Sequence, residues 1–224
     1  QVTALEDFTN NGETELEIIT ENIISNAVYY EDVNPENILI HIRSRPMGRC
    51  SSTGDPHYTT FDGYSYHFYD RGEVLMVRSS SRDFEVQART HGGPYSRNCA
   101  VAARENNHLA IIDVCDGSLE ITTRSLSEES APRIYRSGGN QYFIDFVSGA
   151  QIQAHIWGNN MNVYISVISA DYDNTIGMCG TFDGNRNNEG NPAYVIRPYS
   201  QLPDSWKIST ETSLWNWYPE TSDD

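Results

Sequence analysis

The chain has 224 residues, which is enough for one large β domain or for a domain of about 150 residues with a smaller partner. Its formal net charge of −16 at pH 7 would repel phosphate backbones and anionic lipid headgroups, which disfavours nucleic-acid and membrane-surface partners. No stretch approaches the roughly 18 consecutive apolar residues of a membrane-spanning helix, so we expect no membrane insertion. Aromatic residues reach 11%, led by 14 Tyr, which is typical of a folded chain and not of a disordered one.

The first part of the chain carries two strand-like stretches, 15–20 and 38–42, separated by a polar, turn-forming run. Pro46 and Gly48 then interrupt the pattern, as residues at a domain boundary do. We therefore predict a small N-terminal β element, or the end of a preceding domain, over residues 1–48.

Further strand-like stretches follow at intervals of about eight to twelve residues, a spacing typical of antiparallel sandwiches. The first reads Tyr-Ser-Tyr-His-Phe, with large aromatic residues alternating with smaller or polar ones, as a half-buried strand requires. Pairs that adopt positive φ easily, such as Asp116-Gly117 and Gly138-Gly139, lie between the stretches. We predict strands at 64–68, 73–78, 84–89, 100–104, 108–114, 119–123, 141–146, 151–156 and 162–169.

No segment repeats apolar residues with the 3.6-residue period of a helix. The predicted fold is therefore all-β, an antiparallel β-sandwich over residues 49–208 with a C-terminal tail at 209–224. Trp206, Trp215 and Trp217 lie among polar residues near the end of the chain. We expect these tryptophans to pack back onto the sandwich, with an exposed partner-binding patch as the alternative.

The chain has four cysteines, Cys50, Cys99, Cys115 and Cys179. They lack the close pairing of a Cys-x-x-Cys zinc or redox motif, so we favour disulfides over four buried reduced thiols. Three connectivities are open. We favour Cys99 with Cys115, because a turn at 106–107 would place them nearly opposite each other, and Cys50 with Cys179 as a long-range bridge. In the loop-entropy model a bridge that closes about 130 residues adds roughly 4 kcal/mol or more to stability.

Residues 179–189 read Cys-Gly-Thr-Phe-Asp-Gly-Asn-Arg-Asn-Asn-Glu, which crowds oxygen-bearing side chains into a glycine-containing loop. Ca²⁺ takes six to eight oxygen ligands, and a flexible loop can aim them inward. The loop is not an EF-hand, because the twelfth position from Asp183 is Tyr194 where an EF-hand has Glu. A missing ligand would come from elsewhere, and Asp62 is the candidate if the long-range disulfide draws the two segments together. The alternative is a turn that binds no metal.

Two stretches resemble the von Willebrand factor type D domain. Residues 50–63 are similar to that family's Cys-x-x-x-Gly-Asp-Pro-His-x-x-Thr-Phe-Asp-Gly opening, and residues 177–185 are similar to its Gly-Leu-Cys-Gly-Asn-Tyr/Phe-Asp/Asn-Gly stretch. Residues 205–208 resemble its closing Ser-Trp-x-Val segment, so the resemblance covers about 50–208. The stretch 99–105 is most similar to the branch of secreted proteins that combines this domain with EGF modules.

The resemblance implies a secreted β-sandwich with Ca²⁺ bound near the second motif. Thr181 stands where the family usually has Asn, and Glu189 where it usually has Asp. The family commonly has Cys at the position of Ile176, so we expect any self-association here to be non-covalent. The ligand set implied by position is Asp62, Thr181, Asp183, Asn185 through its backbone carbonyl, Asn187, Asn188 and Glu189.

In some members of the family the Asp-Pro bond of the Gly-Asp-Pro-His tetrad cleaves itself at acid pH. Here that bond joins Asp55 to Pro56, and His57 or a water could carry the proton. We favour the alternative, an ordinary turn at the entry to a strand. His57 and His67 could also meet across strands and bind zinc, but no third ligand is evident, and we do not favour a zinc site.

We therefore expect an extracellular, calcium-binding structural or adhesive module that contacts other extracellular proteins or flanking domains of the same precursor. One alternative is a lipid-carrier module of the kind found in yolk lipoproteins, which a large apolar cavity would favour. The other is a hydrolase. The sequence has no Gly-x-Ser-x-Gly, His-Glu-x-x-His or phosphate-loop motif, so we predict no enzyme activity and no catalytic residues.

Overall fold

In this computed structural model, residues 13–18, 38–43, 47–55, 57–69, 71–93, 95–126, 130–189 and 206–219 are described. The chain divides into two compact units, Gln1–Pro46 and Met47–Asp224. In the first, β1 (Glu13–Ile18) and β2 (Ile38–Arg43) pair antiparallel. No helix within the described ranges is long and apolar enough to cross a membrane.

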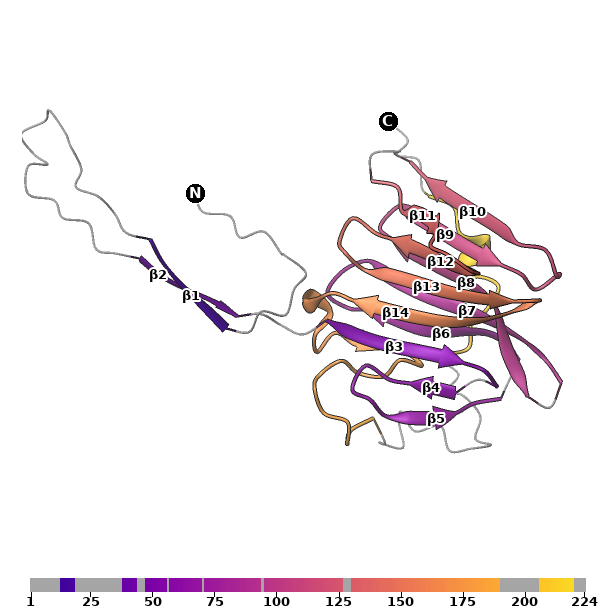
Figure 1. Ribbon diagram of the computed structural model, residues 1–224, viewed down its shortest axis with the longest axis horizontal. Helices are drawn as coiled ribbons and strands as arrows, with labels where there is room; N and C mark the ends of the chain where they lie inside the picture. The colour runs from indigo at the N-terminus through magenta and orange to yellow at the C-terminus, as the bar shows by residue number, and fades with distance from the viewer. Residues whose placement is uncertain are drawn as a thin grey trace, which may run out of the picture. The chain divides into compact units, whose positions relative to one another are not determined.

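The second unit consists of two antiparallel sheets packed face to face (Figure 1). The seven-stranded sheet has the order β11-β12-β13-β14-β3-β4-β5, and the six-stranded sheet has the order β10-β9-β8-β7-β6-β15. The larger sheet contains β3 (Gly48–Thr53), β4 (His57–Thr59), β5 (Ser65–His67), β11 (Arg133–Arg136), β12 (Gln141–Asp145), β13 (Gln151–Trp157) and β14 (Asn160–Val167). The smaller contains β6 (Gly72–Ser79), β7 (Phe84–Gly92), β8 (Ser96–Glu105), β9 (His108–Asp113), β10 (Glu120–Ser125) and β15 (Thr175–Ile176).

The core lies between the two sheets, because the central strands of the larger sheet turn alternate side chains inward. In β14 the buried positions are every second residue, and β13 follows the same alternation. Fully buried side chains from both sheets fill the space between them, among them Leu75, Met76, Phe84, Ile152 and Ile165. This alternation is the signal from which the strands were predicted, and the all-β sandwich is confirmed.

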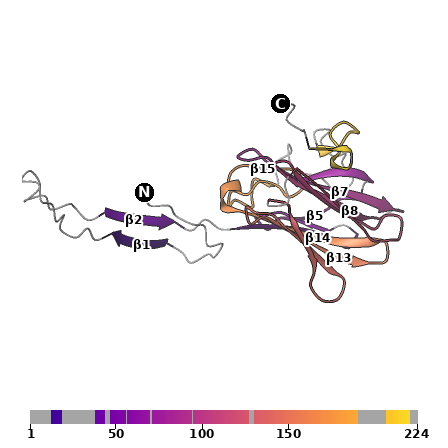
Figure 2. The same cartoon turned by 90° about the horizontal axis from the view of Figure 1, so that it is seen from above.

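The smaller sheet is also covered on its outer face. Strand β8 is buried at almost every position. The segment 206–219, which includes the short 3₁₀ helix η4 (Leu214–Asn216), packs Leu214, Trp215 and Trp217 against the outward side chains of β8 and β9. Figure 2 shows this segment in yellow on the side of β7 and β8 away from β13 and β14. The tryptophans pack back onto the sandwich, as predicted.

Every predicted strand has an observed counterpart, but four observed strands were not predicted. They are β3, β4, β11 and β15, which are short or polar. Strand β3 is the most informative of them, because Cys50 pairs with Ile165 of β14 and its neighbours pair with β4. Its hydrogen-bonded neighbours on both sides, and not its own composition, make this segment a strand.

Candidate metal-binding site

The loop that follows β4 lies against residues 179–189, which we call the acidic loop. The predicted disulfide between Cys50 and Cys179 is present, with a Cα–Cα distance of 5.5 Å, and it ties β3 to the start of the acidic loop. The backbone N–H of Phe61 donates to the carbonyl of Cys179 at 3.0 Å. These two links bring Asp62 beside the acidic loop, as expected from the sequence.

Asp62 lies within a run of backbone N–H groups of the acidic loop. Its carboxylate accepts hydrogen bonds from the N–H groups of Asp183 and Gly184, each at 3.1 Å, and of Asn185 at 3.2 Å. Gly184 has a φ of +79°, a conformation that costs glycine little and that lets successive N–H groups converge. The acidic loop is therefore folded around the carboxylate of Asp62.

Asp183 is the centre of a second set of contacts. Its Oδ1 accepts the N–H of Asn185 at 2.8 Å, and its Oδ2 accepts the side-chain amide of Asn188. The Thr181 hydroxyl in turn donates to Oδ1 of Asn188 at 3.5 Å. Asn187 contributes a backbone N–H to Oδ1 of Asn185 at 3.2 Å, and its side chain is exposed. Hydrogen bonds therefore join four of the predicted ligands, Thr181, Asp183, Asn185 and Asn188, and the Asn187 side chain is not among them.

Glu189, the last residue of the acidic loop, folds back against Gly180 and Thr181 at its start. It is only 4% exposed, and its Oε2 accepts the backbone N–H of Thr181 at 3.4 Å. Its Oε1 is buried with no hydrogen-bond partner among the described residues. A Cβ on Gly180 would lie 1.9 Å from Oε2, so the carboxylate occupies space that only glycine leaves free. The Gly180–Glu189 contact was not predicted, because it joins residues nine apart across the loop.

The pKa values of the three carboxylates are shifted in different directions. Burial raises the pKa of Glu189 to about 7, and the negative charges of Asp62 and Asp183 act in the same direction against the hydrogen bond from Thr60. Burial also raises the pKa of Asp62, and the adjacent Asp183 carboxylate adds to this against the backbone donors. For Asp183 burial acts upward, but hydrogen bonds, chiefly from the Asn185 N–H, outweigh it and lower its pKa.

Asp62 and the residues of the acidic loop offer the kind of ligand atoms, oxygens, that a hard cation binds. Carboxylate, amide and hydroxyl oxygens are what Ca²⁺ prefers, and the unpartnered buried oxygen of Glu189 is a group that a cation would satisfy. Within the described ranges no group of three or more His, Cys, Asp or Glu side chains is arranged to hold a metal ion. A cation here would therefore require Asp62 and Asn188 to turn from their present hydrogen bonds toward it.

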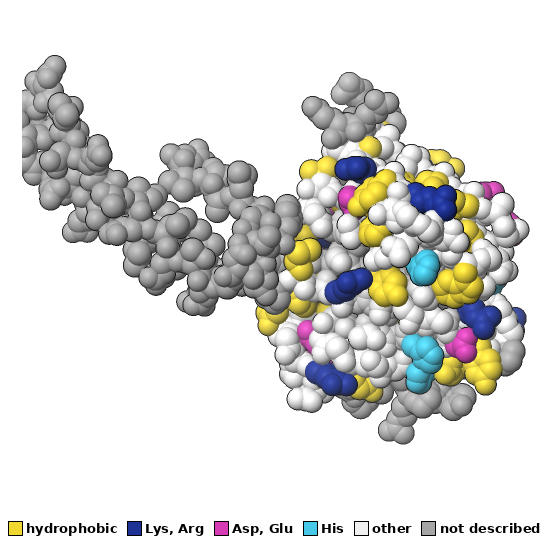
Figure 3. Space-filling view, viewed as in Figure 1, with side chains coloured by type: hydrophobic (Ala, Val, Ile, Leu, Met, Phe, Trp, Pro, Cys, Tyr) yellow, Lys and Arg dark blue, Asp and Glu magenta, His cyan; other side chains and the backbone are white. Residues whose placement is uncertain are grey.

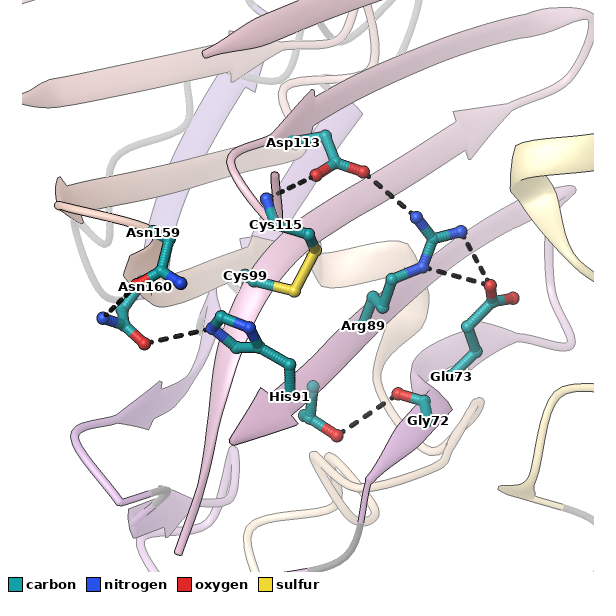
Figure 4. The surroundings of a disulfide bond; sticks show 10 residues. Gly72, Glu73, Arg89, His91, Cys99, Asp113, Cys115, Asn159 and Asn160 are labelled. Carbon is teal, nitrogen blue, oxygen red and sulfur yellow. Dashed lines mark hydrogen bonds and ion pairs between the residues drawn. A yellow bond between two sulfur atoms is a disulfide. The ribbon is translucent and has the colours of Figure 1, made fainter. Parts of the chain in front are cut away.

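The second predicted disulfide, between Cys99 and Cys115, closes the hairpin of β8 and β9 with a Cα–Cα distance of 4.7 Å (Figure 4). The N–H of Cys115 donates to Asp113 at 2.8 Å, and Arg89 joins Asp113 to Glu73 through ion pairs at 3.1 and 2.8 Å. The bridge and this ion-pair group hold neighbouring strands together.

The Gly-Asp-Pro-His tetrad is only partly described, because Pro56 lies outside the described residues. The carboxylate of Asp55 pairs with Arg97 at 3.1 Å, and the N–H of Gly54 donates to Asn162 at 2.9 Å. His57 is in β4. The expectation that the Asp55–Pro56 bond stays intact remains a prediction, checked by the intact mass of the chain held at about pH 5 to 6.

The family model for the von Willebrand factor type D domain matches residues 50–190. The chain is 28% identical over 171 residues to SCO-spondin of Gallus gallus, covering 73% of this chain and 3% of that protein. It is 27% identical over 180 residues to Sushi domain-containing protein 2 of Homo sapiens, covering 71% and 21%. It is 24% identical over 173 residues to Mucin-5AC of Homo sapiens, covering 73% and 3%.

The chain thus spans a small part of each of these relatives, and the narrower resemblance to proteins with EGF modules remains a prediction. The family match, in contrast, covers more than half of the chain. The chain belongs, as the sequence predicted, to the von Willebrand factor type D domain family.

Proposed function

We propose that this module binds one Ca²⁺ at the acidic loop, and that the ion stiffens this end of the sandwich for contacts with flanking domains or other extracellular proteins. The observation that carries the proposal is Glu189, a buried carboxylate with an unpartnered oxygen, placed where the charges of Asp62 and Asp183 both act on it. Buried carboxylates without compensation are costly, and a divalent cation would offset their mutual repulsion.

The proposed ligands come from both loops. Asp62, Asp183 and Glu189 would supply charge, and the remaining oxygens would come from uncharged groups of the acidic loop. Turning the amide of Asn188 would replace a donor that now faces Asp183 by an oxygen, an arrangement that is favourable only with a cation between them. The full proposed set is Asp62, Thr181, Asp183, Asn185, Asn187, Asn188 and Glu189.

Calcium-dependent stability tests the proposal. An ion that binds only the folded state stabilises it by mass action, by about 2.7 kcal/mol at a free concentration of one hundred times Kd. We expect the melting temperature of the parent to rise in excess Ca²⁺ relative to chelator, and calorimetric titration to show one Ca²⁺ per chain.

The matched pair of variants is Asp183→Asn and Asp116→Asn. Both remove one negative charge without changing side-chain size, but Asp116 is exposed at the turn between β9 and β10, away from the acidic loop. Asp183→Asn should lose most of the calcium response, and Asp116→Asn should keep it. A parent chain that melts at the same temperature in Ca²⁺ and in chelator would rule the proposal out.

The cavity beneath the C-terminal segment does not favour the lipid-carrier alternative. That cavity has a volume of about 230 Å³ and is bordered largely by charged and polar side chains. Its lining comprises Arg78, Glu85, Arg104, Glu211, Thr212, Ser213, Leu214, Asn216 and Trp217. A lipid chain needs an apolar wall that this cavity does not offer.

A further inference from the structure

Two histidines face each other on the outer surface of the seven-stranded sheet. His57 in β4 is directly paired with His67 in β5, and their Nδ1 atoms lie 2.6 Å apart. Both side chains are exposed. Figure 3 views this face of the molecule and shows histidines, in cyan, at its surface. Two imidazole nitrogens this close together on an exposed surface are a potential chelating pair.

The neighbouring residues keep both rings in place. His67 stacks on Tyr69 with an interplanar angle of 2°, and Tyr69 packs edge-on against Tyr95. The ring of His57 meets that of His67 at 76° with centroids 4.5 Å apart. A Cβ on Gly54 would lie 3.4 Å from the His57 ring, an ordinary van der Waals distance, so the Gly54 backbone lies beside this ring. Aromatic packing therefore preorganises the pair.

The separation of the two nitrogens suits a shared metal ion. With metal–nitrogen bonds of about 2.0 to 2.1 Å, two imidazoles on one ion have nitrogens about 2.9 Å apart at a right angle and about 3.3 Å apart in a tetrahedron. From the observed 2.6 Å the nitrogens would have to move apart by about 0.3 to 0.7 Å, which a small rotation of exposed side chains can supply. At this distance one Nδ1 donates a hydrogen bond to the other, and a metal ion bound by both would take the place of that proton.

We propose that His57 and His67 form a transition-metal site that takes Cu²⁺ in preference to Zn²⁺ and that shares no residue with the acidic loop. Imidazole nitrogen suits these ions, and the Irving–Williams order places Cu²⁺ above Zn²⁺. Ca²⁺ prefers oxygen and does not compete. No third His, Cys, Asp or Glu joins the pair in the described part of the chain, so water fills the remaining positions. The two histidines would therefore chelate the metal ion between β4 and β5, at the surface and outside the hydrophobic core.

Metal titration at neutral pH tests this site on the full chain, with Ca²⁺ in excess so that the acidic loop is not a competitor. We expect one Cu²⁺ per chain, with an electron paramagnetic resonance spectrum that shows two nitrogen ligands, and weaker binding of Zn²⁺. His57→Gln and His67→Gln should each weaken Cu²⁺ binding by about tenfold or more, because even the outer partners of a metal ligand contribute that much.

His155→Gln is the matched control. His155 is exposed on the same face of the sheet, but its cross-strand neighbours are Gln141 and Asn162. This variant should bind Cu²⁺ like the parent, and all three variants should melt like the parent because the replaced side chains are exposed. Parental affinity in both His57→Gln and His67→Gln, or an equal loss in His155→Gln, would overturn the assignment.

Discussion

Gly180 illustrates how closely the acidic loop is packed. Its φ is +75°, and a Cβ there would lie 1.9 Å from Oε2 of Glu189. We expect Gly180→Ala to lower the free energy of unfolding by about 2 to 4 kcal/mol, measured with urea, because backbone strain and a displaced carboxylate act together. Gly117→Ala is the control, since Gly117 has a similar φ of +86° and no atom within 4 Å of its Cβ position. An equal loss in both variants would show that the contact with Glu189 contributes nothing.

Glu189 should make the stability of the calcium-free chain, measured in chelator, depend on pH. A pKa raised from 4.5 to about 7 means that the folded state holds the proton more tightly than the unfolded state. The associated stability is complete below pH 4.5 and is lost as the pH rises through about 7. The stability of the parent relative to Glu189→Gln, from urea unfolding, should therefore fall over this interval. A difference that stays constant with pH would contradict the raised pKa.

Among the elements, the turn between β6 and β7 connects the two sheets through Arg82. Its guanidinium contacts Glu105 of β8 and pairs with Asp171, in the 3₁₀ helix η2 (Ser169–Asp171) after β14, at 2.8 and 2.9 Å. Asp171 is fully buried. We expect Asp171→Ala to cost about 3 to 5 kcal/mol in urea unfolding, because Arg82 would be left partly buried without its main partner.

The control for this ion pair is Asp83→Ala. Asp83 also pairs with an arginine, Arg104, but its side chain is 53% exposed. Exposed pairs contribute about 0 to 1 kcal/mol, so this variant should unfold nearly like the parent. If both variants lose the same small amount, the connection through Arg82 does not hold the sheets together.

The C-terminal segment is an element that stabilises the outer face of the smaller sheet. Leu214 is buried against Leu109 and Ile111, and the fully buried Gln87 accepts the N–H of Leu214 at 2.8 Å and donates to the carbonyl of Thr212 at 2.8 Å. We expect Leu214→Ala to cost about 2 to 4 kcal/mol and to shift the tryptophan emission toward that of exposed indole. If Leu214→Ala has the stability and tryptophan emission of the parent, the packing of this segment does not stabilise the sheet.

For the molecule as a whole, the two disulfides should act differently. In the loop-entropy model the bridge over 129 residues contributes about 5 kcal/mol and the bridge over 16 residues about 3 kcal/mol. Replacing both Cys50 and Cys179 by Ala should therefore destabilise the chain more than replacing Cys99 and Cys115. Only the first replacement should also weaken the proposed Ca²⁺ binding, because only that bridge holds the acidic loop beside Asp62. Equal effects of the two replacements on calorimetric Ca²⁺ affinity would contradict this assignment.

The sequence alone determined the fold class and the more regular strands, because alternation of apolar and polar residues is a local property of each strand. It also favoured the Cys99–Cys115 bridge, which the structure contains, since the two cysteines flank a predicted hairpin turn. The oxygen-rich composition of the acidic loop was equally visible, and the family's motifs pointed to Asp62 as its partner.

Only the tertiary structure decided the contacts between segments that are distant along the chain. Strand β3 is held by β14 and β4, the Arg82 connection joins a turn to a distant 3₁₀ helix, and η4 covers β8. The close approach of His57 to His67 depends on the pairing register of β4 with β5. Register and packing follow from the summed contacts of whole sheets, and a shift of one residue would reverse the face on which each side chain lies, so no local pattern specifies them.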